Sequence, residues 1–388
     1  MKNSNNKRNR YIAFVLLVIM LLSVLPANKA SAAEFADTVD AKSAILMEAS
    51  SGMVLYEQNA DQALPPASVT KIMTLLIVME AIDNGNITMS DMVTVSENAA
   101  SMGGSQVYLE SGEQMSVEDM IKSVVVSSAN DAAVALAEHI AGSEASFVSL
   151  MNQKAKELGM KNSNFVNTNG LDDNVTDHLI SARDIAIMSR ELLKHEKILD
   201  YTTIWQDSIR DGAFTLSNTN RLIRFYEGAN GLKTGSTSKA KFCISATAKR
   251  AEMQLICVIM GAPTRDIRNA EAKKLLDYGF ANYGVYTYSP IEIGDIKVVG
   301  GVSEKLSLIT TEYSCVLEKG KIGSVKEQLV YDEVYPAPVK SGDKVGRVVF
   351  SLDNEVIGES AIIASNTVEK ISFGHVLYRI LNKMVSIF

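Results

Sequence analysis

Cysteine and histidine are scarce in this chain, and their scarcity limits the chemistry that it can carry. The 388 residues include three cysteines and four histidines, with no C-x-x-C pair and no H-E-x-x-H motif. The sequence therefore contains no recognisable zinc ligand set, and it indicates neither a metal nor any other cofactor. Cys243 and Cys257 lie in apolar, strand-like runs, which favours buried free thiols, although a Cys243–Cys257 disulfide stays open as an alternative.

An excess of positive charge is also absent. The 38 Lys and Arg residues are outnumbered by 45 Asp and Glu residues, so the net charge is -7. A nucleic-acid partner favours the opposite balance, and we expect none. The hydrophobic content of 47% is typical of a globular chain, and the length allows a large core and more than one domain.

The first 33 residues are typical of a secretory signal peptide. A basic start is followed by the apolar run Tyr11–Leu25 and by the cleavage pattern Ala30-Ser31-Ala32. The run is shorter than the ~20 residues that a membrane-spanning helix needs, which favours a cleaved signal over an uncleaved anchor. We therefore expect the protein to be exported.

Hydrophobic patterning predicts an α+β fold for residues 34–290. The segment begins with a β-hairpin over 43–57 and ends with strands between 229 and 260 and a helix over 269–279. Further helices are expected at 68–83, 116–126, 131–141, 146–158 and 180–195. Helices enclosed between a hairpin and later strands predict an antiparallel sheet covered by helices, with an inserted helical subdomain.

The remaining chain changes character twice. Residues 291–365 alternate between short strands and turns, which predicts a small all-β domain. Residues 366–388 place apolar side chains at helical spacing, with His375, Arg379 and Lys383 on the opposite face. This pattern favours an amphipathic helix at a membrane surface over a helix docked on its own β-domain. We therefore expect a peripheral protein on the outer face of the cytoplasmic membrane.

Three short motifs carry the functional signal. They are Ser68-Val69-Thr70-Lys71 (S-x-x-K), Ser128-Ala129-Asn130 (S-x-N) and Lys233-Thr234-Gly235 (K-T-G). The first two patterns also occur elsewhere in the chain, so each is weak alone. The set is specific because the first motif opens a predicted helix, the second interrupts one and the third lies on a predicted strand.

This arrangement suits nucleophilic catalysis without histidine. Residues three apart share a helix face, so Lys71 can reach the hydroxyl of Ser68 and act as its base if the amine is neutral. Lowering the pKa of a lysine to about 7 costs roughly 4–5 kcal/mol, which burial and a second cation such as Lys233 can supply. If Lys71 keeps its proton, the base must be another group, such as Ser128 acting as a relay.

The ordered motifs resemble the penicillin-recognising serine transferases, the superfamily of penicillin-binding proteins and serine β-lactamases. The resemblance spans about residues 40–285, and low-molecular-mass D-Ala-D-Ala carboxypeptidases fit best within it. Supporting stretches are PASVTK at 66–71, SSANDAA at 127–133, NTNGL at 167–171 and GLKTGST at 231–237. The β-rich domain and the final helix also resemble this subfamily, which is anchored by its C-terminus. A β-lactamase/transpeptidase-like fold is implied.

The resemblance implies a role for each motif residue. Ser68 is the acylated nucleophile, Lys71 its general base, and Ser128 the proton relay to the leaving amine. The implied substrate-binding residues are Asn130, Lys233, Thr234, Gly235, Ser236 and Thr237, with the backbone N–H groups of Ser68 and Ser236 as the oxyanion hole. The implied partners are peptidoglycan stem peptides, with β-lactam antibiotics as covalent inhibitors. The implied reaction removes the terminal D-Ala of a pentapeptide stem during cell-wall biogenesis.

Two features depart from the family pattern. Asn169 stands where many relatives have histidine, and Lys239 and Lys241 add cations just after the K-T-G strand. Both departures bear on substrate preference more than on the class of reaction.

Other functions remain open to different degrees. A class A β-lactamase is disfavoured because no convincing Glu-x-x-x-Asn lies between Asn130 and Lys233. A Ser–His–Asp hydrolase is disfavoured because no G-x-S-x-G occurs. A D,D-endopeptidase with the same site, and a non-catalytic β-lactam sensor or wall-binding protein, stay as alternatives.

Overall fold

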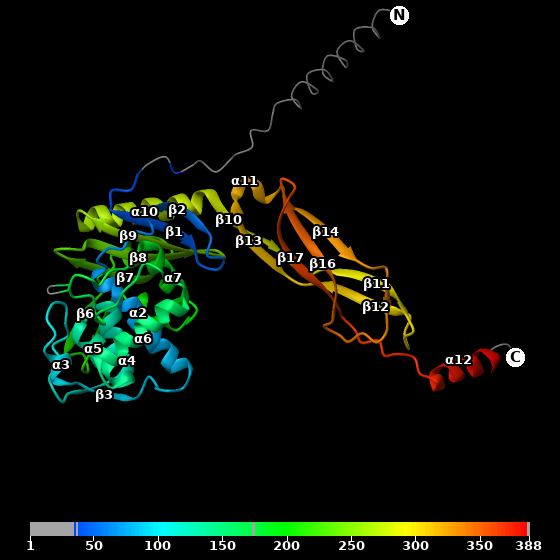
Figure 1. The fold of residues 1–388 in the computed structure, drawn as a ribbon, viewed down its shortest axis with the longest axis horizontal. Coiled ribbons are helices and arrows are strands. Elements are labelled where there is room, and N and C mark those ends of the chain that lie inside the picture. The colour runs from blue at the N-terminus through cyan, green and yellow to red at the C-terminus, as the bar shows by residue number, and fades with distance from the viewer. Residues whose placement is uncertain (1–34, 36–37, 173–174, 386–388) are drawn as a thin grey trace, which may run out of the picture.

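A five-stranded antiparallel sheet forms the centre of the larger body in Figure 1, in the order β2-β1-β9-β8-β7. The computed structural model describes residues 35, 38–172 and 175–385, so the predicted signal peptide at 1–33 lies outside them. The strands are β1 (Ser43–Glu48), β2 (Val54–Gln58), β7 (Ala229–Thr237), β8 (Lys241–Arg250) and β9 (Met253–Ala262). The predicted antiparallel sheet is confirmed, and each strand extends to within a few residues of its expected bounds.

Helices cover both faces of this sheet. The helix α10 (Arg265–Asn282) packs on one face, while α2 (Lys71–Asp83) and α7 (Ala182–Leu192) pack on the other. Cys243 belongs to the core on the α2 side and Cys257 to the core on the α10 side. Both cysteines are buried free thiols, so the Cys243–Cys257 disulfide does not form.

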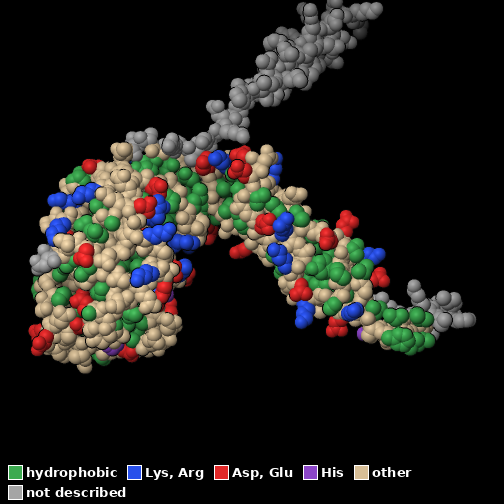
Figure 2. All heavy atoms as spheres, viewed as in Figure 1, with side chains coloured by type: hydrophobic (Ala, Val, Ile, Leu, Met, Phe, Trp, Pro, Cys, Tyr) green, Lys and Arg blue, Asp and Glu red, His purple; other side chains and the backbone are tan. Residues whose placement is uncertain are grey.

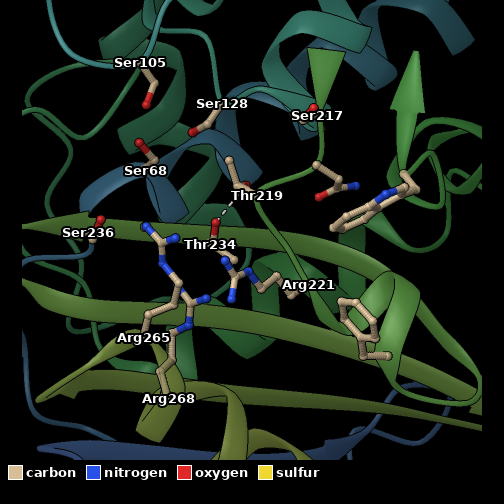
Figure 3. A pocket seen from close by; sticks show the side chains of 14 residues that line it. Ser68, Ser105, Ser128, Ser217, Thr219, Arg221, Thr234, Ser236, Arg265 and Arg268 are labelled. Carbon is tan, nitrogen blue, oxygen red and sulfur yellow. Dashed lines mark hydrogen bonds between the residues drawn. The ribbon is translucent and has the colours of Figure 1, made fainter. Parts of the chain in front are cut away.

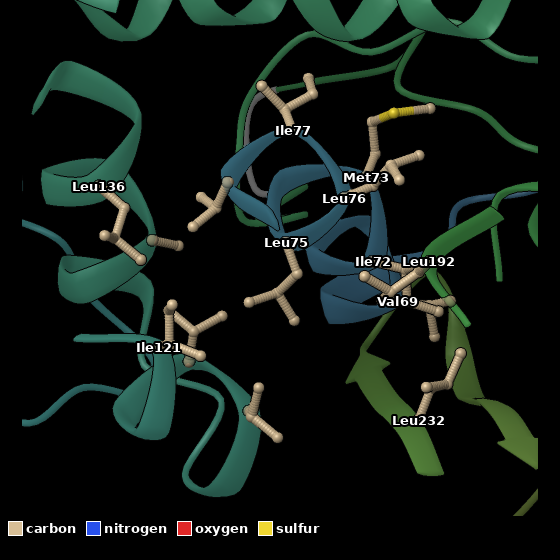
Figure 4. Close-up of a cluster of buried hydrophobic side chains, with 14 of the residues drawn as sticks. Val69, Ile72, Met73, Leu75, Leu76, Ile77, Ile121, Leu136, Leu192 and Leu232 are labelled. Atoms are coloured by element: carbon tan, nitrogen blue, oxygen red, sulfur yellow. The ribbon is translucent and has the colours of Figure 1, made fainter. Parts of the chain in front are cut away.

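The helical subdomain is built around α2. This helix is apolar on nearly all sides, as expected of a helix at the centre of a core. Figure 4 shows Leu75 and Leu76 of α2 among side chains from neighbouring elements, including Ile121, Leu136 and Leu192. The surrounding helices are α3 (Glu97–Ala100), α4 (Val117–Val126), α5 (Asn130–Ala141), α6 (Glu144–Glu157), α8 (Ile198–Thr202) and α9 (Leu222–Phe225). Two small hairpins complete it: β3 (Met92–Thr94) with β4 (Gln114–Ser116), and β5 (Gln206–Ile209) with β6 (Phe214–Ser217).

Helix ends follow the capping residues of the sequence. The hydroxyl of Ser116 accepts the backbone N–H of Asp119 at 3.1 Å at the start of α4. Gly142 ends α5 in the left-handed conformation, with φ of 78°. Thr264 caps α10, which therefore begins four residues before the predicted helix at 269.

The chain after α10 is β-rich. Its elements are β10 (Tyr283–Tyr288), β11 (Glu292–Val299), β12 (Lys305–Thr310), β13 (Tyr313–Glu318), α11 (Lys319–Ile322), β14 (Lys326–Tyr331), β15 (Val334–Pro336), β16 (Lys344–Leu352) and β17 (Glu355–Ala364). A six-stranded sheet has the order β14-β16-β17-β12-β11-β15, and β10 pairs with β13. Strand β10 precedes residue 291, the predicted start of the β-rich domain. Strand pairing with the C-terminal region therefore starts earlier than the sequence suggests.

The final helix, α12 (Phe373–Val385), lies at the far end of the β-rich region from the larger body (Figure 1). Its apolar side chains are exposed, with Phe373 82% accessible and Leu381 52% accessible. Figure 2 shows them as a hydrophobic patch on the helix. They do not join the core of the β-rich region, so the helix is not docked on it. Among the described residues no helix is both long and apolar enough to cross a membrane.

Candidate active site

Ser68 lies in a short 3₁₀ turn, Ala67–Thr70, and not in the first turn of an α-helix as the sequence predicted. The α-helix begins only at Lys71. The turn follows Pro65 and Pro66, Ala67 adopts a φ of 50°, and the Thr70 hydroxyl donates to the Ala67 carbonyl at 2.8 Å. These local constraints delay the α-helix by one turn and present Ser68 to a cavity.

Lys71 brings its amine to the nucleophile from inside the protein. Its Nζ lies 3.0 Å from Ser68 Oγ, 2.5 Å from Asn130 Oδ1 and 2.8 Å from the Asn169 carbonyl oxygen. The side chain is completely buried. The S-x-x-K and S-x-N motifs therefore meet, as expected from their order and spacing.

The surroundings of Lys71 favour the neutral amine. Burial lowers its pKa well below the ordinary 10.5, and the positive charge of Lys233 lowers it further. Asp131 opposes this shift, but its buried carboxylate also accepts the backbone N–H groups of Val107 and Leu109. Burial and the Arg268 charge in turn lower the pKa of Lys233 to about 7. Lys71 is thus suited to accept a proton near neutral pH.

Ser128 and Asn130 occupy the break between α4 and α5. Ser128 has a φ of 63°, and Figure 3 shows its hydroxyl and that of Ser68 pointing into the same space. The Asn130 side chain donates to the Gly103 carbonyl at 2.7 Å, in addition to accepting from Lys71. The break between the two helices thus places the Ser128 hydroxyl in the cavity and the Asn130 amide behind the cavity wall.

The K-T-G motif lies on β7 and forms another wall. Thr234, Gly235 and Ser236 line the cavity, and the Thr234 hydroxyl donates to Thr219 Oγ1 at 2.8 Å. Lys233 is buried behind this wall, where its amine donates to the Thr234 carbonyl at 3.1 Å. The motif therefore presents hydroxyl and backbone groups to the cavity, whereas its lysine side chain lies buried behind this wall.

Glycine is required at position 235 because β7 passes against the turn that carries Ser68. A Cβ atom there would lie 2.8 Å from the Ser68 backbone nitrogen and 2.9 Å from the Pro66 carbonyl oxygen. Contacts this short do not occur for real side chains. The close approach brings the backbone of Ser236 next to that of Ser68, as a shared oxyanion hole needs.

Thr237 is the one predicted site residue whose hydroxyl is committed elsewhere. It donates to Asp172 Oδ2 at 2.5 Å, accepts the backbone N–H of Ala240 at 2.9 Å and does not line the cavity. Lys239 also reaches this loop, with its amine 2.5 Å from the Asp172 carbonyl oxygen. Thr237 and Lys239 thus connect the end of β7 to Asp172, and Lys239 also reaches the Val175 carbonyl.

Comparison with known proteins agrees with this geometry. Residues 28–264 match the family described as D-alanyl-D-alanine carboxypeptidase (peptidase S11), and residues 289–370 match the C-terminal domain of penicillin-binding protein 5. The D-alanyl-D-alanine carboxypeptidase DacF of Bacillus subtilis is 46% identical over 341 residues, covering 86% of this chain and 87% of DacF. The chain belongs to the D-alanyl-D-alanine carboxypeptidase family.

Solved structures show the same relationship. Penicillin-binding protein 5 from Haemophilus influenzae superposes with a TM-score of 0.73 at 34% identity, covering 86% of this chain and 99% of that one. Penicillin-binding protein D2 from Listeria monocytogenes, in its ampicillin-bound form, superposes with a TM-score of 0.57 at 32% identity. That match covers 62% of this chain and 98% of the Listeria chain. The fold and the enzyme class predicted from the motifs are therefore confirmed.

Three arginines of this family member were not found by sequence reasoning. Arg221, Arg265 and Arg268 line the same cavity of about 600 Å³ as Ser68, together with Trp205 and Phe225. Figure 3 shows the three guanidinium groups near Thr234. No motif marks them, because they come from the chain before α9 and from the first turn of α10 and meet only in the folded protein.

His178 also has a partner that the sequence did not reveal. Its Nδ1 accepts the backbone N–H of Val166 at 3.0 Å, so in the neutral ring Nε2 carries the hydrogen and donates to Thr70 Oγ1 at 2.8 Å. Burial lowers the pKa of His178 to about 4, which keeps the ring neutral. Because Thr70 in turn bonds to Ala67, His178 supports the turn that carries Ser68.

Asn169 and Gly170 complete the floor behind the nucleophile. Asn169 contributes its backbone carbonyl to Lys71, and its side-chain oxygen accepts the Leu171 backbone N–H at 2.9 Å. A Cβ at Gly170, whose φ is 86°, would lie 1.9 Å from the Ala67 carbonyl oxygen. The contact of position 169 with Lys71 therefore comes from the backbone and does not depend on the Asn169 side chain.

Proposed function

We propose that this enzyme is a serine-type D-alanyl-D-alanine carboxypeptidase that removes the terminal D-Ala from peptidoglycan pentapeptide stems through an acyl-enzyme on Ser68. The observation that carries the proposal is the 3.0 Å approach of a buried amine, that of Lys71, to the Ser68 hydroxyl. Burial and Lys233 lower the pKa of this amine, so it can serve as the base that a serine nucleophile requires. Trimming of stem peptides places the enzyme in cell-wall biogenesis.

Acylation begins when Ser68 Oγ attacks the carbonyl carbon between the last two D-Ala residues and its proton passes to the neutral Lys71 amine. The backbone N–H groups of Ser68 and Ser236 stabilise the negative oxygen of the tetrahedral intermediate. The C–N bond then breaks, and the leaving amine takes a proton from Ser128, which Lys71 replenishes. The products are a Ser68 ester and free D-alanine. Water later hydrolyses the ester and releases the shortened stem.

The terminal carboxylate of the substrate fits the end of the cavity near Thr234. The Thr234 hydroxyl and the Arg268 guanidinium both line this end. Lys233 adds positive charge from behind the strand, and its burial prevents direct contact with solvent. Ser236 and Gly235 supply the wall between this carboxylate and the scissile bond. Asn130 lies behind the cavity and contributes to binding by holding the Lys71 amine in place. Thr237 contributes to substrate binding indirectly, because its hydrogen bonds with Asp172 and Ala240 hold the end of β7 in position.

Turnover of a synthetic stem pentapeptide tests the proposed reaction. The mature protein is expected to release one D-alanine per peptide, which mass spectrometry detects as the loss of a single alanine residue. A cross-linked peptide dimer serves as the matched second substrate. Cleavage of the dimer without loss of alanine from the pentapeptide would instead indicate the endopeptidase, and lack of turnover with stable penicillin binding would indicate a sensor.

β-Lactam antibiotics are proposed as covalent inhibitors of the same site. Their strained amide presents a carbonyl carbon to Ser68 and a carboxylate to the Thr234 end, as the D-Ala-D-Ala terminus does. The ampicillin-bound Listeria protein D2, which shares the fold, supports this assignment.

A second proposal concerns location: the protein is exported and binds the outer face of the cytoplasmic membrane through α12. Phe373, Tyr378, Ile380 and Leu381 are between 50% and 82% accessible on this helix. Apolar side chains on an amphipathic helix insert into the headgroup region of a bilayer. The helix also lies away from the catalytic cavity, so binding would leave the cavity open to the wall (Figure 1).

Truncation after Ser365 is expected to move the protein from the membrane fraction to the soluble fraction, because it removes the whole apolar face of α12. Fractionation of cells followed by immunoblotting measures the shift, and pentapeptide turnover checks that the catalytic part still folds. A matched variant, Leu381→Lys, places a charge on the apolar face and should lower membrane binding by about tenfold or more. Full retention of the truncated protein on membranes would contradict the proposal.

A further inference from the structure

The cavity in front of Ser68 is larger than a D-alanine leaving group requires. Its volume is about 600 Å³, and it continues from Ser68 past Thr234 to Trp205 and Phe225. Figure 3 shows the labelled part of this cavity, with Ser68 and Ser128 on one side of Thr234 and Arg221 on the other. The methyl side chain of a terminal alanine leaves most of this volume unfilled.

Three positive side chains line this cavity around Thr234. Arg268 is buried and is held in place, because its guanidinium donates to the Cys243 carbonyl at 3.3 Å and to Asn269 Oδ1 at 2.9 Å. Arg221 and Arg265 are exposed at the cavity wall. Neither forms an ion pair or a side-chain hydrogen bond with any residue that the structure describes.

The three guanidinium groups repel one another. Burial, and after it the charge of Arg265, lower the pKa of Arg268 to about 10; Arg221 lowers it by a smaller amount, while Cys243 and Asp266 oppose the shift. Concentrating like charge in a cleft is unfavourable unless an anion occupies it. One terminal carboxylate compensates one of these three charges, so two remain for a further anionic group.

We propose that Arg221 and Arg265 form a second anionic subsite, which binds a carboxylate on the side chain of the leaving D-residue. The inference rests on the proposed function, since it extends the leaving-group side of that site. The substrate class is a peptide that ends in D-Ala followed by an acidic D-amino acid such as D-Glu. Its terminal carboxylate occupies the position at Thr234 and Arg268, its methylene groups lie toward Trp205 and Phe225, and its side-chain carboxylate meets Arg221 and Arg265.

The neighbouring Arg224 provides a matched control. It lies on α9 close to Arg221, but its guanidinium stacks over Trp205 at 5.5 Å and over Phe225 at 5.7 Å, and it does not line the cavity. Its replacement by glutamine removes one positive charge from the same surface but leaves all three guanidinium groups of the cavity in place.

Three N-acetylated tripeptides that differ only in their last residue test the subsite. They end in D-Ala-D-Glu, D-Ala-D-Gln and D-Ala-D-Ala, and release of the last amino acid is measured by mass spectrometry. Because glutamine has the shape of glutamate without its charge, the ratio of kcat/KM for the D-Glu and D-Gln peptides isolates the carboxylate. We expect a ratio of about ten in the wild type, corresponding to about 1.4 kcal/mol.

The ratio is expected to fall toward one in Arg221→Gln and Arg265→Gln, and to stay near the wild-type value in Arg224→Gln. It should also fall with rising salt, because the subsite is open to solvent. A wild-type ratio near one overturns the proposal, as does a high ratio that survives in the Arg221→Gln/Arg265→Gln double variant. Hydrolysis of the D-Ala peptide alone, with neither longer residue accepted, overturns it too. Failure of the D-Ala peptide to react would count against the proposed function itself, separately from the subsite.

Discussion

Replacing Ser68 by alanine is expected to abolish covalent labelling by a fluorescent penicillin and to lower pentapeptide turnover by at least about 10⁴-fold. The reason is that no ester can form without the Ser68 oxygen, whereas the remaining cavity contributes only binding and an oxyanion hole. Labelling is read by gel fluorescence of the purified protein, and turnover by mass spectrometry. Because Ser68 lies at the cavity surface, the alanine variant should keep its fold and its thermal unfolding temperature.

Ser105 supplies the matched control for this experiment. It lines the same cavity, but its side chain has no buried amine beside it in the described structure. The Ser105→Ala variant should therefore remain labelled by the penicillin. If Ser68→Ala were labelled as strongly as the wild type, the nucleophile would have to be a different side chain.

Removing the amine of Lys71 is expected to reduce the rate of acylation by about 10²–10⁴-fold, the range that a general base contributes. Lys71→Gln keeps a polar group near Asn130 but cannot accept the Ser68 proton at neutral pH. Lys71→Arg introduces a permanent positive charge, because a guanidinium does not lose its proton in proteins, and it therefore cannot act as the base either. Both variants should therefore lose activity, and stopped-flow acylation by penicillin measures the loss.

The pH dependence of the wild type follows from the same amine. Below its pKa, Lys71 is protonated and cannot accept a proton, so acylation should be slow at low pH and should rise as the pH passes through that pKa. Burial and Lys233 lower this pKa well below 10.5, so the rise should lie far to the acid side of an ordinary lysine titration. Substantial activity in Lys71→Arg, without a pH-dependent rise, would instead favour a charged Lys71 with Ser128 as the relay.

Much of the fold was predictable from local patterns. The β-prone runs in 43–57 and the apolar runs of β8 and β9 predict strands, because a sheet buried on both faces requires nearly continuous apolar strands. Ser116 and Gly142 mark helix ends through capping that depends on the residues themselves. The start of the α-helix at Lys71 was not predictable, because the preceding 3₁₀ turn depends on contacts with His178 and Gly170, about a hundred residues away in sequence.

The candidate site was predictable to the extent that its residues fall in motifs. The motifs S-x-x-K, S-x-N and K-T-G, and the resemblance that they carry, identified eight residues that lie in or directly behind one cavity: Ser68, Lys71, Ser128, Asn130, Lys233, Thr234, Gly235 and Ser236. Thr237 was placed with them because of its neighbours in sequence, although its hydroxyl bonds to Asp172.

By itself the sequence determined which chemical groups are available: a serine, two lysines and an amide in a fixed order, without a histidine or metal-ligand motif. Only the tertiary structure decided their states. Lys71 is suited to the proposed role of base because the fold buries it next to Lys233, and desolvation together with like charge disfavours its protonated form. In the same way, Arg221, Arg265 and Arg268 become one cationic wall only because α10 packs beside the segment that precedes β7. Burial and proximity depend on contacts between distant segments, which no local pattern records.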